Sequence, residues 1–199
     1  MSLVKHNNNS ISDITSVNLE QGKMTLISSQ TASGSASIEF TSGIDSTYPI
    51  YRFEFINIYS GTGRPLKFQA STNGGSSYGV TVTNTNFSTI HFENDSSPSL
   101  AYQASQDQAQ STSNISLHRN LGDDAEHNGV GTLFIYNPSS TTFVKHYIGT
   151  LNTSGASDFS ANDFVAGYFN TTSSVDAFKF LPDSGTISGT IKLYGIKDS

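Results

Sequence analysis

Cysteine and tryptophan are both absent from these 199 residues, and charged side chains make up only 13% of them. Without cysteine the chain has neither disulfide bonds nor thiolate ligands for a metal, so its fold must rest on packing and hydrogen bonds. This composition suits synthesis in a reducing cytoplasm. Runs rich in Ala, Leu, Glu and Lys, which favour helices, are also missing. These absences exclude a disulfide-stapled scaffold and argue against a helical domain.

Charge and hydropathy argue against two classes of partner. No apolar run approaches the ~20 residues that cross a bilayer, and the start of the chain lacks the apolar core of a signal peptide. The formal net charge is −6, and the 10 Lys and Arg residues are scattered singly. Such a distribution cannot neutralise a row of phosphates. We therefore expect neither nucleic acid nor membrane as a partner.

What the chain does contain is a β-rich composition with short alternating segments. Ser, Thr, Asn and Gly are abundant, and 13 Phe and 9 Tyr supply most of the large apolar side chains. Short segments in which apolar and polar residues alternate, separated by turn residues, predict an antiparallel two-sheet β-sandwich of jelly-roll type with about ten strands, although twelve segments show the pattern. The length suits one domain, which we place at residues 23–199. The clearest segments are 24–28, 36–41, 51–55, 65–70, 79–83, 88–92, 115–118, 129–136, 142–148, 164–169, 174–180 and 189–196.

Two local signals refine this strand pattern. The alternation set by residues 51–55 reverses at Ile56-Asn57-Ile58, which predicts either a β-bulge or a change from one-sided to two-sided burial there. Asn73-Gly74-Gly75 stands between the segments 65–70 and 79–83. Asn and Gly accept the positive φ of tight turns, so this sequence predicts a β-hairpin that joins the two segments and fixes their register.

The same turn has a functional interpretation. Residues 71–78 have the pattern Ser-x-Asn-x-Gly-x-Ser-Tyr, which resembles the Asp-box that recurs in sialidase propellers. Asp-boxes occur once per blade in several copies, whereas this pattern occurs once in the chain. No period of 20 to 50 residues repeats either, which argues against a propeller. We therefore interpret the stretch as a turn.

Residues 1–22 differ from the rest because their apolar residues are isolated among polar ones. Such a segment has too little apolar surface to order itself, so we expect an extended arm that binds another subunit or a neighbouring protein. The alternative is an arm wrapped on its own domain. A sandwich of this size also has open sheet edges, which favours a homo-oligomer, with a trimer preferred. The residues expected to make the arm contact are Leu3, Val4, Lys5, Asn7, Asn8, Asn9, Ile11 and Ile14.

An acidic segment between Gly122 and Gly129 is the first candidate chemical site. It contains Asp123, Asp124 and Glu126, and oxygen ligands of this kind bind Ca²⁺. The spacing of an EF-hand is absent, so an ordinary acidic surface loop is the preferred interpretation.

His91, Glu93 and Asp95 form a second candidate, because they would share one face of an extended strand and bind a metal or transfer protons. The turn-forming residues 94–98 predict that the strand ends before Asp95. The sequence contains no nucleophile elbow, zinc-binding helix motif or dinucleotide fingerprint. We therefore expect no catalytic residue, no bound metal and no cofactor.

Aromatic side chains can also bind glycans by stacking under sugar rings. Tryptophan, the usual best platform, is absent, and most Tyr and Phe residues occupy strand positions that core packing explains. Tyr59, Tyr78 and Tyr102 fall in expected loops, and we consider them a possible shallow glycan contact.

Distinctive stretches follow one another along nearly the whole chain: residues 31–48, 51–58, 72–78, 134–146, 166–173 and 188–197. They resemble virion structural proteins of marine tailed bacteriophages, including cyanophages, and residues 3–12 are similar to the start of longer members. The resemblance implies a non-enzymatic virion component made in the host cytoplasm, whose partners are other capsid or tail proteins bound through the arm. No fibre shaft is encoded, which favours a capsid decoration or cement protein. The alternative is a tail-attached or fibre adhesin that binds host surface glycans.

Overall fold

The computed structural model describes residues 23–118 and 121–197, which form thirteen strands in two antiparallel sheets. Over these residues no helix is long and apolar enough to cross a membrane. The strands are β1 (Met24–Ser35), β2 (Ile38–Phe40), β3 (Ile50–Ser60), β4 (Leu66–Ser71), β5 (Val82–Phe92), β6 (Ser99–Tyr102), β7 (Gln108–Ser111), β8 (Ile115–His118), β9 (Gly129–Tyr136), β10 (Lys145–Gly155), β11 (Phe159–Phe169), β12 (Ala177–Pro182) and β13 (Ile187–Ile196).

Eight of these strands make a jelly roll. In an eight-stranded jelly roll, one sheet holds the first, eighth, third and sixth strands, and the other holds the second, seventh, fourth and fifth. Here β1, β13, β3 and β9 lie side by side in one sheet, and β2, β12, β4 and β8 lie side by side in the other. The predicted two-sheet sandwich of jelly-roll type is therefore confirmed.

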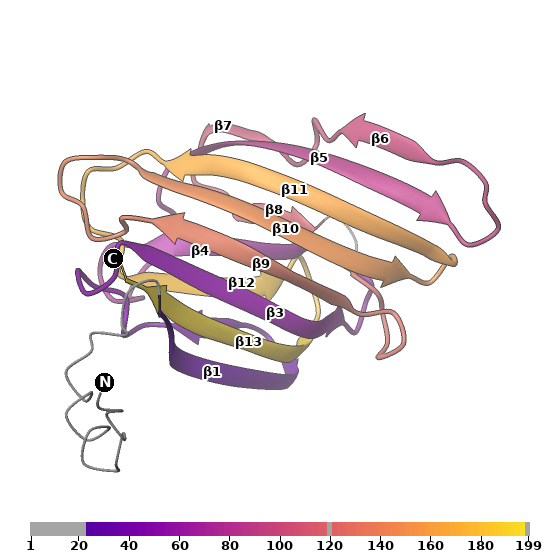
Figure 1. The fold of residues 1–199 in the computed structure, drawn as a ribbon, viewed down its shortest axis with the longest axis horizontal. Coiled ribbons are helices and arrows are strands. Elements are labelled where there is room, and N and C mark those ends of the chain that lie inside the picture. The colour runs from indigo at the N-terminus through magenta and orange to yellow at the C-terminus, as the bar shows by residue number, and fades with distance from the viewer. Residues whose placement is uncertain (1–22, 119–120, 198–199) are drawn as a thin grey trace, which may run out of the picture.

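Two insertions widen the larger sheet. One carries β5, β6 and β7 between β4 and β8, and the other carries β10 and β11 between β9 and β12. Beyond β9 the sheet continues in the order β10-β11-β5-β6, and β7 also pairs with β5. The result is a nine-stranded sheet with the four-stranded sheet packed behind it (Figure 1).

Aromatic side chains fill the space between the two sheets. Alternation along β3 points Tyr51, Phe53 and Phe55 inward, where each is buried. The ring of Phe53 meets that of Phe180 from β12 at a centroid distance of 4.9 Å in an edge-to-face arrangement. Edge-to-face pairs of this kind add to the gain from burying the rings. The core therefore depends on phenylalanines from both sheets, as the composition suggested.

The predicted β-bulge at residues 56–58 is confirmed. The register of β3 shifts between Phe55 and Ile58 against β9, and Asn57 has a φ of 51°. Gly189 of β13 lies opposite with a φ of 118°. A Cβ atom on Gly189 would lie 2.5 Å from the carbonyl oxygen of Asn57, so the bulge requires glycine at this position.

The predicted hairpin at Asn73–Gly75 is wrong. β4 pairs with β12 and β8 in the small sheet, whereas β5 pairs with β11 in the large sheet, so the loop between them crosses from one sheet to the other. The loop closes on its own side chains: the N–H groups of Asn73 and Gly75 donate to Ser71 Oγ at 3.1 and 3.0 Å. Turn chemistry thus fixed the local bend, but it did not decide which strands pair.

The strand count also exceeds the expected ten. β6 and β7 form in the polar region 94–114, where side chains give little strand signal, because their backbones pair with β5. The expected strands 79–83 and 88–92 are parts of the single strand β5. Backbone pairing with a neighbour can thus form a strand that apolar alternation does not predict.

Candidate functional site

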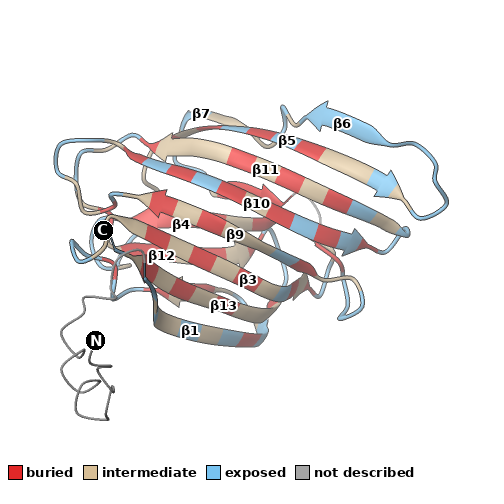
Figure 2. Cartoon of the chain, in the orientation of Figure 1, coloured by how far each residue is buried: buried red, intermediate tan, exposed pale blue. Residues whose placement is uncertain are grey.

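The outward surface of the widened part of the large sheet is the candidate site. Along β10, buried residues such as Tyr147 and Gly149 alternate with exposed residues such as His146 and Ile148, and Figure 2 shows this striping. The register places Ile148 beside Phe134 of β9 and beside Ala166 of β11. Outward side chains from strands far apart in the sequence therefore meet in continuous rows across the sheet.

These outward residues contain no Asp, Glu, Lys or Arg, and we call them the uncharged face. The same surface carries Arg52, Glu54 and Lys192 on β3 and β13, so the charges are confined to its other half. Arg52 lies at the border, with its guanidinium 5.7 Å from the ring centroid of Phe134. The uncharged face consists of Val130, Thr132, Phe134, Tyr136, His146, Ile148, Thr150, Asn152, Ser154, Ser160, Asn162, Phe164, Ala166, Tyr168, Thr83, Thr85, Phe87, Thr89 and His91.

An open groove of about 660 Å³ crosses the uncharged face. Tyr136, His146 and Tyr168 flank it, and Ile148 and Ala166 contribute to its floor. Ala166 stands between larger neighbours in its row, and its short side chain leaves the space open. The imidazole of His146 lies 5.9 Å from the ring of Tyr168, measured between centroids. The groove therefore presents aromatic edges and a mainly apolar lining to solvent.

A stacked aromatic pair stands beside the groove. The rings of Phe87 and Phe164 are 4.7 Å apart at an interplanar angle of 11°, and Phe87 is 41% exposed. A second hollow of about 160 Å³ lies between this pair and Ile148. In the register, Phe87 pairs with Tyr102 of β6, which is 60% exposed. Exposed aromatic surface thus continues from the groove to the sheet edge.

The layer beneath the groove is buried and partly polar. Burial raises the pKa of the Tyr147 hydroxyl, and desolvation lowers the pKa of the buried Lys145 ammonium. Lys145 Nζ donates to the carbonyl oxygens of Phe143 and Thr171 at 2.9 and 3.1 Å. These hydrogen bonds tie the start of β10 to the loop before it and to the loop that follows β11. They therefore hold in place one of the strands that carry the groove.

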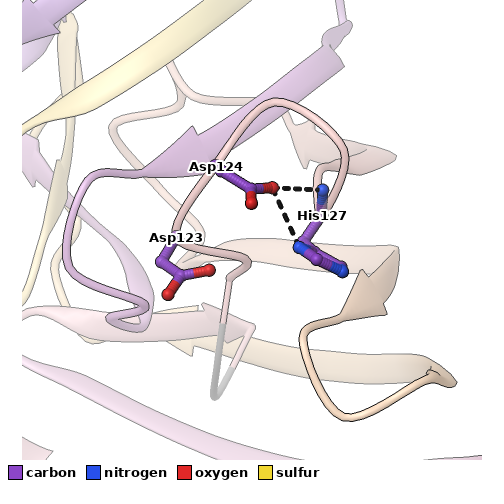
Figure 3. A group of neighbouring side chains, drawn as sticks. All are labelled: Asp123, Asp124 and His127. Carbon is purple, nitrogen blue, oxygen red and sulfur yellow. Dashed lines mark hydrogen bonds and ion pairs between the residues drawn. The ribbon is translucent and has the colours of Figure 1, made fainter.

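Two of the three carboxylates considered as alternative cation ligands come together with the histidine of the same segment. Asp123, Asp124 and His127 form a group whose ligand atoms lie within 4.8 Å of one another, whereas the carboxylate of Glu126 is not part of it (Figure 3). Asp124 Oδ1 accepts the N–H groups of Glu126 and His127 at 3.0 and 2.9 Å, and it lies 2.9 Å from His127 Nδ1.

These hydrogen bonds explain what the Asp124 carboxylate does in the loop. The N–H of His127 contributes most to lowering the pKa of Asp124. Both Asp123 and Asp124 are exposed to solvent. The carboxylate that would be the central ligand therefore already caps the backbone of its own loop.

The three tyrosines considered for glycan contact lie in separate places. Tyr59 is on β3, and Tyr102 is on β6, five strands further along the sheet. Tyr78 donates to Glu39 Oε2 at 3.1 Å, and Lys179 Nζ lies 4.3 Å from the centre of its ring. Burial, with the Glu39 charge second, raises the pKa of Tyr78 to about 12. Of the three, Tyr102 alone adjoins the uncharged face.

The remaining candidates are placed as follows. β5 ends at Phe92, before Asp95, as the turn sequence predicted. His91 Nε2 lies 3.2 Å from Asp95 Oδ1, with both side chains exposed. The arm residues Leu3 to Ile14 lie outside the described residues.

Sequence reasoning missed the uncharged face. Its residues come from four strands that span positions 82 to 169, and each strand alone shows only alternation. One signal was available: segment 129–136 has apolar residues on both alternating faces, as strands covered on both sides do. No protein-family model matches the chain, and a search of curated proteins gives no match.

Proposed function

We propose that this chain is a non-enzymatic structural component of a tailed-phage virion, a surface jelly roll that is anchored by its N-terminal arm and serves as a capsid decoration or cement protein. The observation that carries the proposal is the uncharged face. A contiguous surface without Asp, Glu, Lys or Arg, in which aliphatic and aromatic residues are interspersed among Ser, Thr and Asn, on a chain of net charge −6, is typical of a protein that works by contact with other proteins.

The geometry of the candidate groups also favours an assembly role. The acidic loop uses Asp124 to cap its own backbone, and His91 and Asp95 pair in solvent at a strand end. Neither arrangement aims an acid, base or nucleophile into the groove. The groove itself is open and mainly apolar, which suits packing against another surface better than enclosing a reacting substrate.

The test begins with purified particles of the phage that encodes the chain. Mass spectrometry of the particles should detect its peptides at a copy number comparable to that of a capsid or tail protein. A particle map should then place the jelly roll on the capsid surface. Purified infectious particles that lack the chain would overturn the proposal. Density for the jelly roll at a fibre tip would replace the decoration role with the adhesin alternative.

The second candidate function is an adhesin that binds host surface glycans. The row of aromatic side chains from the half-buried Phe164 through the exposed Phe87 and Tyr102 favours it, because sugar rings stack on such surfaces. An adhesin should bind polysaccharide from the host as an isolated protein. Tyr102→Ala should weaken that binding, whereas Tyr59→Ala, on β3 and away from this row, should leave it unchanged.

A further inference from the structure

We propose that the uncharged face is a self-association surface, on which two copies of this chain pack face to face about a two-fold axis. This inference concerns the isolated protein and does not depend on the proposed virion role. The open sheet edges favoured a homo-oligomer, with a trimer preferred, whereas this proposal names a sheet face as the contact and a two-fold axis as the symmetry.

Charge is the first argument for a second copy as the occupant. The chain carries 16 acidic and 10 basic side chains, so two copies repel one another over most of their surfaces. The uncharged face is the exception, because four adjacent strands expose no ionised side chain there. Contact between two such faces buries no unpaired charge, whereas a charged partner would leave its own charges uncompensated.

Shape is the second argument. Along β11, the small Ala166 and the large Phe164 are successive outward residues, so the hollow at Ala166 lies directly beside the stacked rings of Phe164 and Phe87. A two-fold axis that runs across the strands between these residues places Phe164 of each copy over the Ala166 hollow of the other. The same axis brings Arg52 of each copy toward Glu54 of the other, because the register aligns Arg52 with the Ala166 row and Glu54 with the Phe164 row.

The size of the face is the third argument. Strands lie ~4.8 Å apart and same-face residues ~6.8 Å apart, so four strands with five outward rows cover roughly 600 Å². Two copies together bury about 1,200 Å², which is the lower end of the range for specific protein interfaces. The exposed side chains Tyr102 and Leu100 of β6 extend the same surface to its edge, where the Tyr102 hydroxyl donates to the Asp107 carboxylate. Apolar sheet faces also pack well on one another at an angle set by their twist.

A saccharide is a poorer occupant of the groove. Sugar recognition needs several converging hydrogen-bond groups beside an aromatic platform. Here the exposed lining is mainly apolar and includes Ile148 and Ala166, while the polar groups come from separate strands: Thr83, Asn84, Thr85, Tyr136, His146 and Tyr168. The groove therefore matches the apolar side chains of an identical face more closely than it matches a sugar.

The test measures the oligomeric state of the full chain by sedimentation equilibrium over a concentration series. The wild-type chain should form a dimer. Ile148→Glu places a carboxylate in the middle of the face and should raise the dissociation constant at least ~10-fold, since like charges then oppose one another.

Leu26→Glu is the matched control. Leu26 of β1 is 52% exposed, the same fraction as Ile148, and it lies in the same row five strands from β11. The Leu26→Glu variant should leave the dimer intact. Circular dichroism with thermal melting should show that both variants are folded. A wild-type chain that stays monomeric at ~100 μM, a trimer, or equal dissociation of both variants would overturn the proposal. A monomeric wild type that binds polysaccharide through Tyr168 would assign the groove to a saccharide instead.

Discussion

His118 Nε2 on β8 lies 3.2 Å from Asp163 Oδ2 on β11, and their side chains are 1% and 0% exposed. β8 is the edge strand of the small sheet, whereas β11 belongs to the insertion that widens the large sheet. This buried pair therefore fastens the inserted hairpin, and with it the uncharged face, to the jelly roll.

Asp163→Ala should destabilise the protein by about 3–5 kcal/mol, because it leaves a buried polar partner without its carboxylate. Urea denaturation at neutral pH measures this as a lower midpoint with an unchanged slope. Asp183→Ala serves as the control, since Asp183 pairs with Lys67 at 2.5 Å while 48% exposed. That surface pair is worth about 0–1 kcal/mol, so similar losses in both variants would contradict the role given to the buried pair.

Gly189→Ala should cost about 1–3 kcal/mol, because it combines a strained φ of 118° with a Cβ atom 2.5 Å from the Asn57 carbonyl oxygen. Gly34→Ala provides the comparison: Gly34 also has a positive φ, 65°, but nothing lies within 4 Å of its Cβ position. Thermal unfolding of both variants separates two causes of instability. Gly34→Ala reports the strain of a positive φ, and Gly189→Ala adds the clash of the new Cβ atom with the Asn57 carbonyl oxygen. Equal losses of stability would show that the bulge tolerates a side chain at position 189.

The free energy of unfolding should fall as pH rises above about 10. Tyr78 has a folded-state pKa raised from 10.0 to about 12, and burial also raises the pKa of Tyr147 and of Tyr51. A raised pKa means that the folded state holds its proton when the unfolded state has lost it, so this stability is present below the unfolded pKa and is lost above it.

Urea midpoints measured from pH 9 upward test this prediction. Tyr78→Phe should show a shallower decline than the wild-type chain, because one of the shifted hydroxyls is gone. Lys145 has the opposite effect on the free energy of unfolding. Its pKa is lowered in the folded state, so as pH rises toward its unfolded pKa of 10.5 it makes the folded state more stable. A wild-type midpoint that rises steadily through pH 10 to 12 would contradict the assignment of the shift to tyrosine.

Deleting residues 1–22 should leave the jelly roll folded, because all thirteen strands lie after residue 23. The thermal midpoint of the truncated chain should therefore stay close to that of the full chain. Incorporation into phage particles should be lost, if the arm makes the contacts expected of Leu3, Val4, Ile11 and Ile14. Normal incorporation of the truncated chain would reject the arm as the anchor.

The alternation of apolar and polar residues predicted most strands of the jelly roll, and the parity change at Ile56–Ile58 predicted its bulge. These features succeed because side-chain periodicity and turn chemistry are local properties of a chain. The turn at Asn73–Gly75 shows the limit. Its sequence demanded a tight bend, yet the strands on either side pair in different sheets, because pairing depends on partners more than a hundred residues away, such as Phe180 for Phe68.

The candidate site lay beyond sequence reasoning for the same reason. Ile148, Ala166 and Thr85 are unremarkable outward residues of three separate strands, and only the register brings them into one row. Composition and periodicity are properties of the chain alone, and they were enough to define an acidic, cysteine-free β-sandwich. Tertiary structure alone decided that two insertions extend one sheet and that their outward sides share a surface without charge, because long-range backbone pairing sets which side chains become neighbours.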